Sequence, residues 1–186
     1  IPMNPKVIFE HVHNTLGDDT IITTEVGQHQ MWAAQFYPFA KPRTFLTSGG
    51  LGTMGYGTGA AIGAQVANPD KKVVAVCGDG GFMMNSQEME TAVRLGLDLT
   101  VIILNDNAYG MIKWKQTGMG FESFGLDLGN PDFVKYAESY GAKGYRPTSV
   151  EDFEKILQEC VNGKGVHLID LAVDYSLNHK ILNELL

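Results

Sequence analysis

The sequence predicts an α/β domain with a doubly wound, mostly parallel sheet of about six strands and helices on both faces. Two observations predict this fold. Short apolar runs rich in β-branched residues, such as 73–77 and 166–173, alternate along the chain with stretches of helical periodicity. Glycine-rich turns follow several of these runs, at the strand ends where open α/β sheets bind ligands. We assign residues 1–186 to a single domain, because no linker, repeat or low-complexity tract divides them.

The composition excludes several classes of protein. The 186 residues are 44% hydrophobic and 19% charged, which argues against disorder. The net charge of −7 gives no reason to expect nucleic acid or an anionic membrane as a partner. Because no apolar run approaches the roughly 18 residues of a membrane span, we expect a soluble, cytoplasmic protein. Cys77 and Cys160 are far apart in the chain, and both are expected to be reduced core residues.

The first half of the chain alternates helices and strands. The predicted elements are a helix at 5–16, a strand at 20–26, a helix at 27–36, a strand at 43–47 and a helix at 57–66. The first helix has Pro5 at its start and apolar residues at helical spacing. Each of the two later helices follows a strand and opens at a glycine turn, which is a favourable corner for an anion.

The second half continues the alternation. The predicted elements are a strand at 73–77, a helix at 85–95, a strand at 100–104, a helix opening near Met111, a helix at 131–140, a strand at 142–145, a helix at 150–161 and a strand at 166–173. Asn85 and Glu88 are spaced as a capping box, and Asn130 is expected to cap the helix at 131–140.

Two segments of the second half have no regular period. The stretch 116–129 is rich in glycine, so we expect a mobile loop over the ligand-binding edge. The tail at 174–186 is too short to assign, and its apolar residues are candidates to dock on a partner: Ile181, Leu182, Leu185 and Leu186.

Two carboxylates lie at the ends of neighbouring strands. Asp79 follows the strand at 73–77 within a glycine turn, and Asp106 follows the strand at 100–104. Each alone is typical of a turn or loop-capping aspartate. Together they favour a Mg²⁺ site, because Mg²⁺ is commonly held by one or two carboxylates plus ligand phosphates. The amides of Gly80 and Gly81, and those near Met111, are placed to receive phosphate oxygens.

These residues resemble a known signature. Gly78-Asp79-Gly80, followed by Asn105-Asp106, is similar to the motif of thiamin diphosphate-dependent enzymes, with Asp106 in place of the second asparagine. The resemblance implies the thiamin diphosphate-binding fold. It further implies that Mg²⁺ is bound by the side chains of Asp79 and Asp106 and by the backbone carbonyl of Ala108. The residues that it places around the diphosphate are Gly78, Gly80, Gly81, Tyr109, Gly110 and Met111.

Two further stretches, 26–35 and 46–55, resemble the large subunit of acetolactate synthase, and the likeness covers nearly the whole chain as its C-terminal domain. The resemblance gives Gly52 and Met54 catalytic roles: the Gly52 carbonyl would accept a hydrogen bond from the cofactor's amino group, and Met54 would separate its two rings. The turn Gly27-Gln28-His29 is counted among the cofactor-binding residues. Alone, His29 is typical of a capping or packing residue.

A second interpretation remains open. Gly50, Gly52 and Gly55 fit the G-x-G-x-x-G pattern of a dinucleotide-binding unit, and Asp79 would be its acidic residue. However, the pattern does not open the domain, and it leaves Asn105-Asp106 without a role.

By resemblance, the function is that of an acetolactate synthase-like transferase, in which pyruvate loses CO₂ and the remaining unit is joined to a second 2-keto acid. The resemblance implies a homo-oligomer in which a glutamate of a pyrimidine-binding domain, of the same or a neighbouring subunit, completes the site. No stretch here resembles that domain, and Glu25 belongs to the strand–turn pattern of the present one. We therefore expect a fragment or one subunit of a split enzyme, inactive alone.

Several alternatives stay open at this point. The chain could be a non-catalytic cofactor-binding module, or part of another thiamin diphosphate-dependent decarboxylase or carboligase. FAD is possible in an intact protein, but this chain offers no site for it. Gly59 stands where the family usually has proline, and Trp114 lies one position before the usual aromatic residue of the substrate channel. The second departure leaves the choice of acceptor open.

Overall fold

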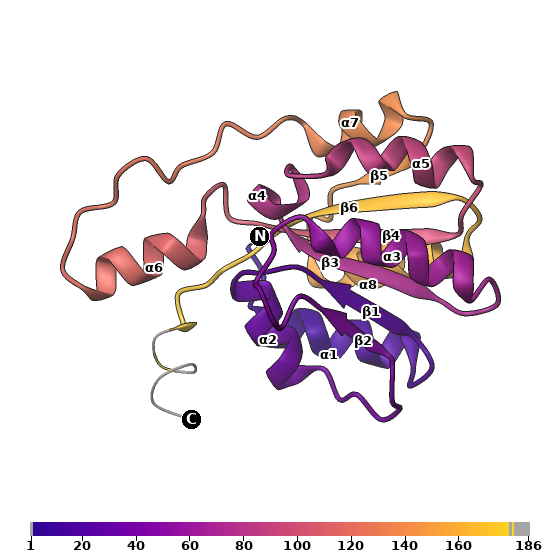
Figure 1. Cartoon of the computed structure of the whole chain (residues 1–186), viewed down its shortest axis with the longest axis horizontal. Helices are drawn as coiled ribbons and strands as arrows, with labels where there is room; N and C mark the ends of the chain where they lie inside the picture. Colours follow the sequence, from indigo (N-terminus) through magenta and orange to yellow (C-terminus); the bar gives the residue numbers. More distant parts are fainter. Residues whose placement is uncertain (1, 179, 181–186) are drawn as a thin grey trace.

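The computed structural model, which describes residues 2–178 and 180, contains one sheet of six parallel strands (Figure 1). The strands are β1 (Ile21–Thr24), β2 (Phe45–Thr47), β3 (Val73–Gly78), β4 (Leu99–Asn105), β5 (Lys143–Tyr145) and β6 (Val166–Ala172). Their order in the sheet is β2-β1-β3-β4-β6-β5, and every neighbouring pair is parallel. The predicted α/β fold is confirmed.

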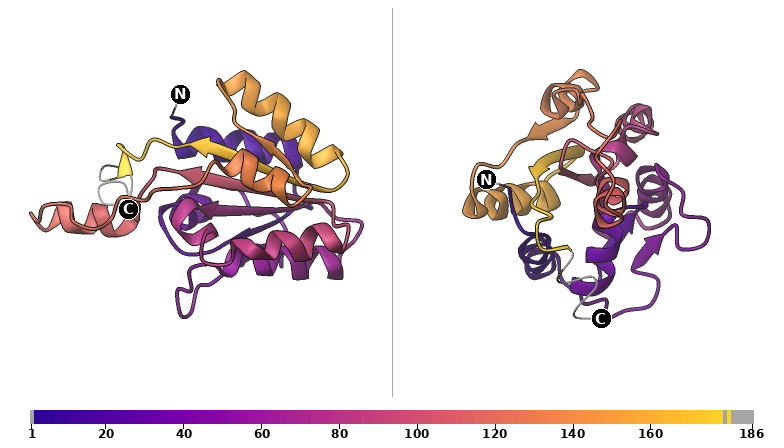
Figure 2. Two further views of the ribbon diagram at one scale, coloured as in Figure 1. Left: turned by 90° about the horizontal axis from the view of Figure 1, so that it is seen from above. Right: turned by 90° about the vertical axis from the view of Figure 1, so that its left-hand side faces the viewer.

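Helices cover both faces of the sheet (Figures 1 and 2). The core on one face is formed with α1 (Pro5–Leu16), α2 (Gln28–Phe36) and α8 (Val150–Asn162), and the core on the other with α3 (Tyr56–Ala67), α5 (Met89–Arg94) and α7 (Phe133–Ser139). Successive residues of β3 point to opposite faces, so Val74 and Val76 join the first core while Val73 and Ala75 join the second. Strand β3 is therefore apolar on both faces, as the sequence predicts.

The direction of winding reverses between β1 and β3. From β1 the chain passes through α2 to β2 at one edge, whereas from β3 it continues through β4 toward the other edge. The carboxyl ends of the strands at such a reversal leave a crevice, which is the usual ligand-binding position in open α/β sheets. The turns after β1, β3 and β4 all open into this crevice.

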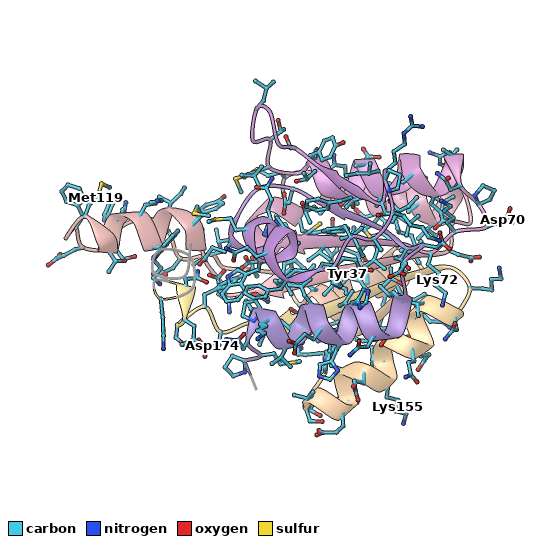
Figure 3. The ribbon with its side chains drawn as sticks, turned by 90° about the horizontal axis from the view of Figure 1, so that it is seen from below. Tyr37, Asp70, Lys72, Met119, Lys155 and Asp174 are labelled. Atoms are coloured by element: carbon cyan, nitrogen blue, oxygen red, sulfur yellow. The ribbon has the colours of Figure 1, made fainter. Side chains whose placement is uncertain are left out.

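Helix α6 (Gly110–Gly118) projects away from the body of the domain (Figures 1 and 2). None of its nine residues is buried. Met119 lies at the far end of this projection, opposite the end of the molecule that carries Asp70 and Lys72 (Figure 3). The helix extends into the segment that the sequence predicts as a loop, which begins at Gln116.

Several local predictions are wrong. A one-turn helix, α4 (Asp79–Phe82), replaces the predicted glycine turn, and a 3₁₀ turn at Ser86–Glu88 precedes α5. The capping box is not formed: the Asn85 side chain accepts no hydrogen bond from the backbone of the turn that follows, and its amide donates to the carbonyl of Gly55 over 3.2 Å. Helix α7 begins after Asp132, so Asn130 is not its cap.

Other expectations are met or lie outside the description. Cys77 and Cys160 are buried free thiols. None of the helices within the described residues combines the length and apolar character that a membrane crossing requires. The four apolar tail residues expected to dock on a partner, 181–182 and 185–186, lie outside the described part of the chain.

Candidate cofactor site

A cavity of about 140 Å³ lies at the carboxyl ends of β1, β3 and β4. All but one of the predicted site residues line it: Gly27, Gln28, His29, Met54, Gly78, Asp79, Gly80, Gly81, Asp106, Ala108, Tyr109, Gly110 and Met111. Residues from four separate stretches of the sequence are thus brought together. The volume is below the roughly 300–1,000 Å³ typical of ligand pockets, so the cavity encloses only part of a cofactor-sized molecule.

Asp79 is the first residue of α4 and is buried, with 1% of its surface exposed. Burial raises the pKa of Asp79 above its ordinary value, since a charge in the interior loses its hydration. Four hydrogen bonds act against this effect, from the side-chain amide of Asn130 and from the backbone amides of Gly80, Asp79 and Asn107. These hydrogen bonds favour the ionised form of the carboxylate, which lines the cavity.

Asp106 follows β4 and carries a second carboxylate beside the first. Burial, and then the negative charge of Asp79, raise the pKa of Asp106 to about 7. The amide of Ala108 and the charge of Lys113 lower this pKa, with a smaller effect. A pair of carboxylates in which the charge of one raises the pKa of the other is a natural site for a divalent cation, which would neutralise both.

The backbone at Ala108 suits the same cation. Tyr109 donates its amide to the Leu126 carbonyl over 2.9 Å, and Leu128 donates its amide to the Asn107 carbonyl over 2.8 Å. These two bonds hold the turn from both sides, and neither uses the carbonyl of Ala108. Within the described residues no group of three or more His, Cys, Asp or Glu forms a metal site. Two carboxylates and a carbonyl oxygen are donors of the kind that Mg²⁺ prefers.

Glycine is required at two positions of the crevice. A Cβ atom at Gly110 would collide with Oδ2 of Asp106 and Nε2 of Gln28. A Cβ atom at Gly81 would collide with the carboxylate of Glu25. These close approaches let backbone amides reach the cavity at the start of α6 and within α4, where they are suited to an anion.

His29 is buried and lines the cavity. Burial lowers the pKa of His29 to about 3, so its imidazole is neutral at ordinary pH. Its Nε2 atom has no hydrogen-bond partner among the residues that the structure describes, and it lies 3.9 Å from Oε1 of Glu25. An unpartnered buried polar atom beside a cavity is consistent with a ligand that supplies the missing contact.

Gly52 is the predicted site residue that does not line the cavity. It lies in the loop between β2 and α3, with a left-handed φ of 66°, two residues before Met54, which does line the cavity. The predicted role of its carbonyl stays a prediction. The dinucleotide interpretation loses support here, because the amide of Gly55 is already bonded to Glu25 rather than open to a phosphate.

Sequence reasoning missed several residues of the site. Val26, Leu104, Ile112 and Tyr175 also line the cavity. Tyr175 follows β6, and burial together with the charges of Asp106 and Asp79 raises its pKa well above the ordinary value. No local sequence pattern indicates this tyrosine, because it reaches the cavity only through the position of β6 in the folded sheet.

Asn130 is the missed residue with the clearest contact. Its Nδ2 donates to Oδ2 of Asp79 over 2.7 Å. The sequence instead predicts that Asn130 caps the helix at 131–140, away from the cofactor site. The following proline was an available signal, since an Asn-Pro pair is more typical of a turn than of a helix interior.

Comparison with known proteins agrees with this geometry. Residues 25–171 match the family model described as "Thiamine pyrophosphate enzyme, C-terminal TPP binding domain", and the chain belongs to this family. It is similar to a probable acetolactate synthase large subunit of Methanococcus aeolicus, with 42% identity over 183 residues. It is also similar to the mitochondrial catalytic subunit of acetolactate synthase of Saccharomyces cerevisiae (45% over 164 residues) and to acetolactate synthase of Bacillus subtilis (37% over 181 residues).

The chain corresponds to only part of these relatives. The matches cover 95%, 88% and 97% of this chain, but 31%, 24% and 32% of the relatives' own lengths. The thiamin diphosphate-binding class predicted from the glycine and aspartate motifs is therefore confirmed for a region that spans about a third or less of its relatives.

Proposed function

We propose that the chain is the Mg²⁺–thiamin diphosphate-binding part of an acetolactate synthase. The observation that carries the proposal is a pair of carboxylates at the ends of two adjacent strands in one cavity, the buried Asp79 and the half-buried Asp106. The names of the relatives support the choice of acetolactate synthase within the family.

The residues divide into a metal–diphosphate end and a ring end. Asp79, Asp106 and the Ala108 carbonyl would hold Mg²⁺. The residues placed to bind the diphosphate and the rest of the cofactor are Gly27, Gln28, His29, Gly78, Gly80, Gly81, Tyr109, Gly110 and Met111. Gly52 and Met54 would contact the cofactor rings. When bound, the cofactor supplies the electron sink for decarboxylation, and the protein supplies binding, orientation and exclusion of water.

The reaction would release CO₂ from pyruvate and join the remaining unit to a second 2-keto acid. In this proposal the apolar lining of the cavity, including Val26 and Leu104, keeps water from the reacting atoms. The small cavity supports a site shared with a pyrimidine-binding domain, and a homo-oligomer follows where that domain belongs to a neighbouring subunit.

Calorimetry tests the metal assignment. Asp79→Ala should abolish binding of thiamin diphosphate in the presence of Mg²⁺, because the diphosphate would then face the Asp106 carboxylate without its cation. Asp70→Ala removes an exposed carboxylate at the opposite end of the molecule and should bind normally (Figure 3). Unchanged affinity in Asp79→Ala would refute the assignment.

Turnover tests the reaction. The chain alone should form no acetolactate from pyruvate, and addition of a pyrimidine-binding domain that carries the missing glutamate should start turnover. If the chain alone turns over at about 1 s⁻¹ or faster, the shared site is refuted and an acid must lie within these residues.

A further inference from the structure

Glu25 follows β1 directly and is completely buried, with 0% of its surface exposed. Its Oε2 accepts the amide of Gly55 over 2.5 Å, and its Oε1 accepts the amide of Gly78 over 3.0 Å. The two donors lie 30 and 53 residues further along the chain. One carboxylate therefore joins two segments that are remote in the sequence.

The two donors belong to opposite ends of the candidate site. Gly55 follows Met54 and precedes the first residue of α3, while Gly78 ends β3 and precedes Asp79. Met54 and Asp79 both line the cavity. The residue next to each of them, Gly55 or Gly78, is thus bonded through its amide to one oxygen of the same side chain.

The carboxylate itself does not reach the ligand space. Glu25 is absent from the described residues that line the cavity, and both of its oxygens are bonded to backbone amides. It is therefore not placed to exchange a proton with a ligand, so it does not replace the glutamate expected from a second domain.

Burial of this group is unfavourable, which indicates a specific role. Loss of hydration raises the pKa of Glu25 to about 7, although the two amides act to lower it. His29 is neutral and gives no countercharge, and the nearby Asp79 repels the carboxylate. The two amides are the main groups that favour the ion, and both are lost if the turns separate.

We propose that Glu25 is a positioning residue that holds the Met54 turn and the Asp79 turn at a fixed separation. Glu25 thereby fixes the position of the ring end of the cofactor site relative to the metal–diphosphate end. This inference rests on the proposed function for the identity of the ligand, but the coupling of the two turns is a property of the protein without ligand.

The first test uses Glu25→Gln, with Glu138→Gln as the control on the exposed surface of α7. Glutamine keeps the shape of the side chain, but its one oxygen can satisfy only one of the two amides. In the chain without ligand, hydrogen exchange at Gly55, at Gly78 or at both should become faster in Glu25→Gln and remain unchanged in Glu138→Gln. Wild-type protection of both amides in Glu25→Gln would overturn the proposal.

The second test uses the wild-type chain, so it does not depend on the folding of a variant. Mg²⁺ with inorganic pyrophosphate would occupy only the metal–diphosphate end. Because Glu25 connects the two turns, binding of Mg²⁺ and pyrophosphate should slow hydrogen exchange at the amide of Gly55 as well as at that of Gly78. Slowing at Gly78 alone would overturn the proposal. If pyrophosphate does not bind, the proposed function fails instead, and the exchange rates of the ligand-free variants still decide the role of Glu25.

The third test separates positioning from general stability. In the holoenzyme, Glu25→Gln should weaken thiamin diphosphate binding about tenfold, the loss expected for one hydrogen bond to a charged group. In the double variant Glu25→Gln/Met54→Ala, the fold loss of thiamin diphosphate affinity should be smaller than the product of the losses in the two single variants. The reason is that both changes act through the same turn. Losses that multiply would indicate a merely structural role and overturn the proposal.

Discussion

Asn130 donates a hydrogen bond of 2.7 Å from Nδ2 to Oδ2 of Asp79, which lies 51 residues earlier in the chain. The same amide nitrogen is 3.3 Å from Oδ1 of Asn105 and 3.3 Å from Oδ1 of Asn107. A residue of the loop before α7 thus connects the end of β3 with the turn after β4. This contact fixes the direction in which Asp79 presents its other oxygen, and it opposes the rise in the pKa of Asp79 caused by burial.

The first prediction concerns this contact. Asn130→Ala should weaken Mg²⁺ binding about tenfold, because loss of a residue that orients a metal ligand commonly costs 10–100-fold in affinity. The measurement is a Mg²⁺ titration in the presence of thiamin diphosphate. Asn14→Ala, an exposed change on α1, serves as the control. Equal Mg²⁺ affinities in the two variants would show that Asp79 needs no such support.

Much of the fold could be predicted because its signals are local. The run at 73–77 is apolar on both faces, and the run at 166–173 is apolar except for His167 and Asp170, a pattern typical of buried parallel strands. Once parallel strands are predicted, their carboxyl ends must meet at one edge, which brings Asp79 and Asp106 together without further information. The proximity of Asp79 and Asp106 could therefore be predicted from the sequence.

The supporting residues could not be found in this way. The partner of Asn130 is 51 residues away, and those of Glu25 are 30 and 53 residues away. Such contacts depend on the conformations of the turns in the folded protein. The periodicity of the sequence does not predict these conformations. The bond from the Asn85 side-chain amide to the carbonyl of Gly55, 30 residues earlier in the chain, is a further contact of this kind.

A second prediction concerns pH. The pKa of Glu25 is raised from 4.5 to about 7 in the folded protein, so between these values the folded state binds more protons than the unfolded state. The contribution of Glu25 to stability therefore falls as the pH rises from about 4.5 to 7. In the absence of Mg²⁺, the free energy of unfolding should decline more steeply over this range in wild type than in Glu25→Gln.

Denaturant unfolding at a series of pH values checks this. Asp106, whose pKa is also raised to about 7, contributes a decline of the same sign to both proteins, so only the difference between them reports on Glu25. Parallel curves for wild type and Glu25→Gln would show that the folded protein does not perturb this carboxyl group.

A third prediction concerns the projecting segment. The side chains of α6 are not buried, and Phe121 and Phe124 are 62% and 86% exposed. Residues 126–128, by contrast, are held by backbone bonds to the turn at Asn107 and Tyr109. Hydrogen exchange should therefore be fast at 116–125 and slower at Tyr109 and Leu128. Exchange at 116–125 as slow as in β3 would show that the segment is ordered by contacts that the isolated chain already makes.

The last prediction separates the two ends of the site through Met54. This side chain lines the cavity from the loop before α3, whereas the carboxylates of Asp79 and Asp106 enter from the ends of β3 and β4. Met54→Ala should therefore leave Mg²⁺ affinity unchanged, because it removes none of the oxygen atoms proposed to bind the metal. With a pyrimidine-binding domain present, it should lower the rate of acetolactate formation, by up to about a hundredfold, since small errors in positioning can cost this much.

Met119→Ala is the matched control for Met54→Ala, because Met119 is 65% exposed and lies at the far end of the projection (Figure 3). It removes the same side-chain atoms at a position away from the cavity. Its turnover should match that of wild type if the effect at Met54 comes from contact with the cofactor.

A normal rate in Met54→Ala would show that Met54 does not contact the cofactor rings, and the carboxylate pair would remain as the supported part of the site. A loss of Mg²⁺ binding in the same variant would instead show that the Met54 turn supports the metal, as the shared bonds to Glu25 allow.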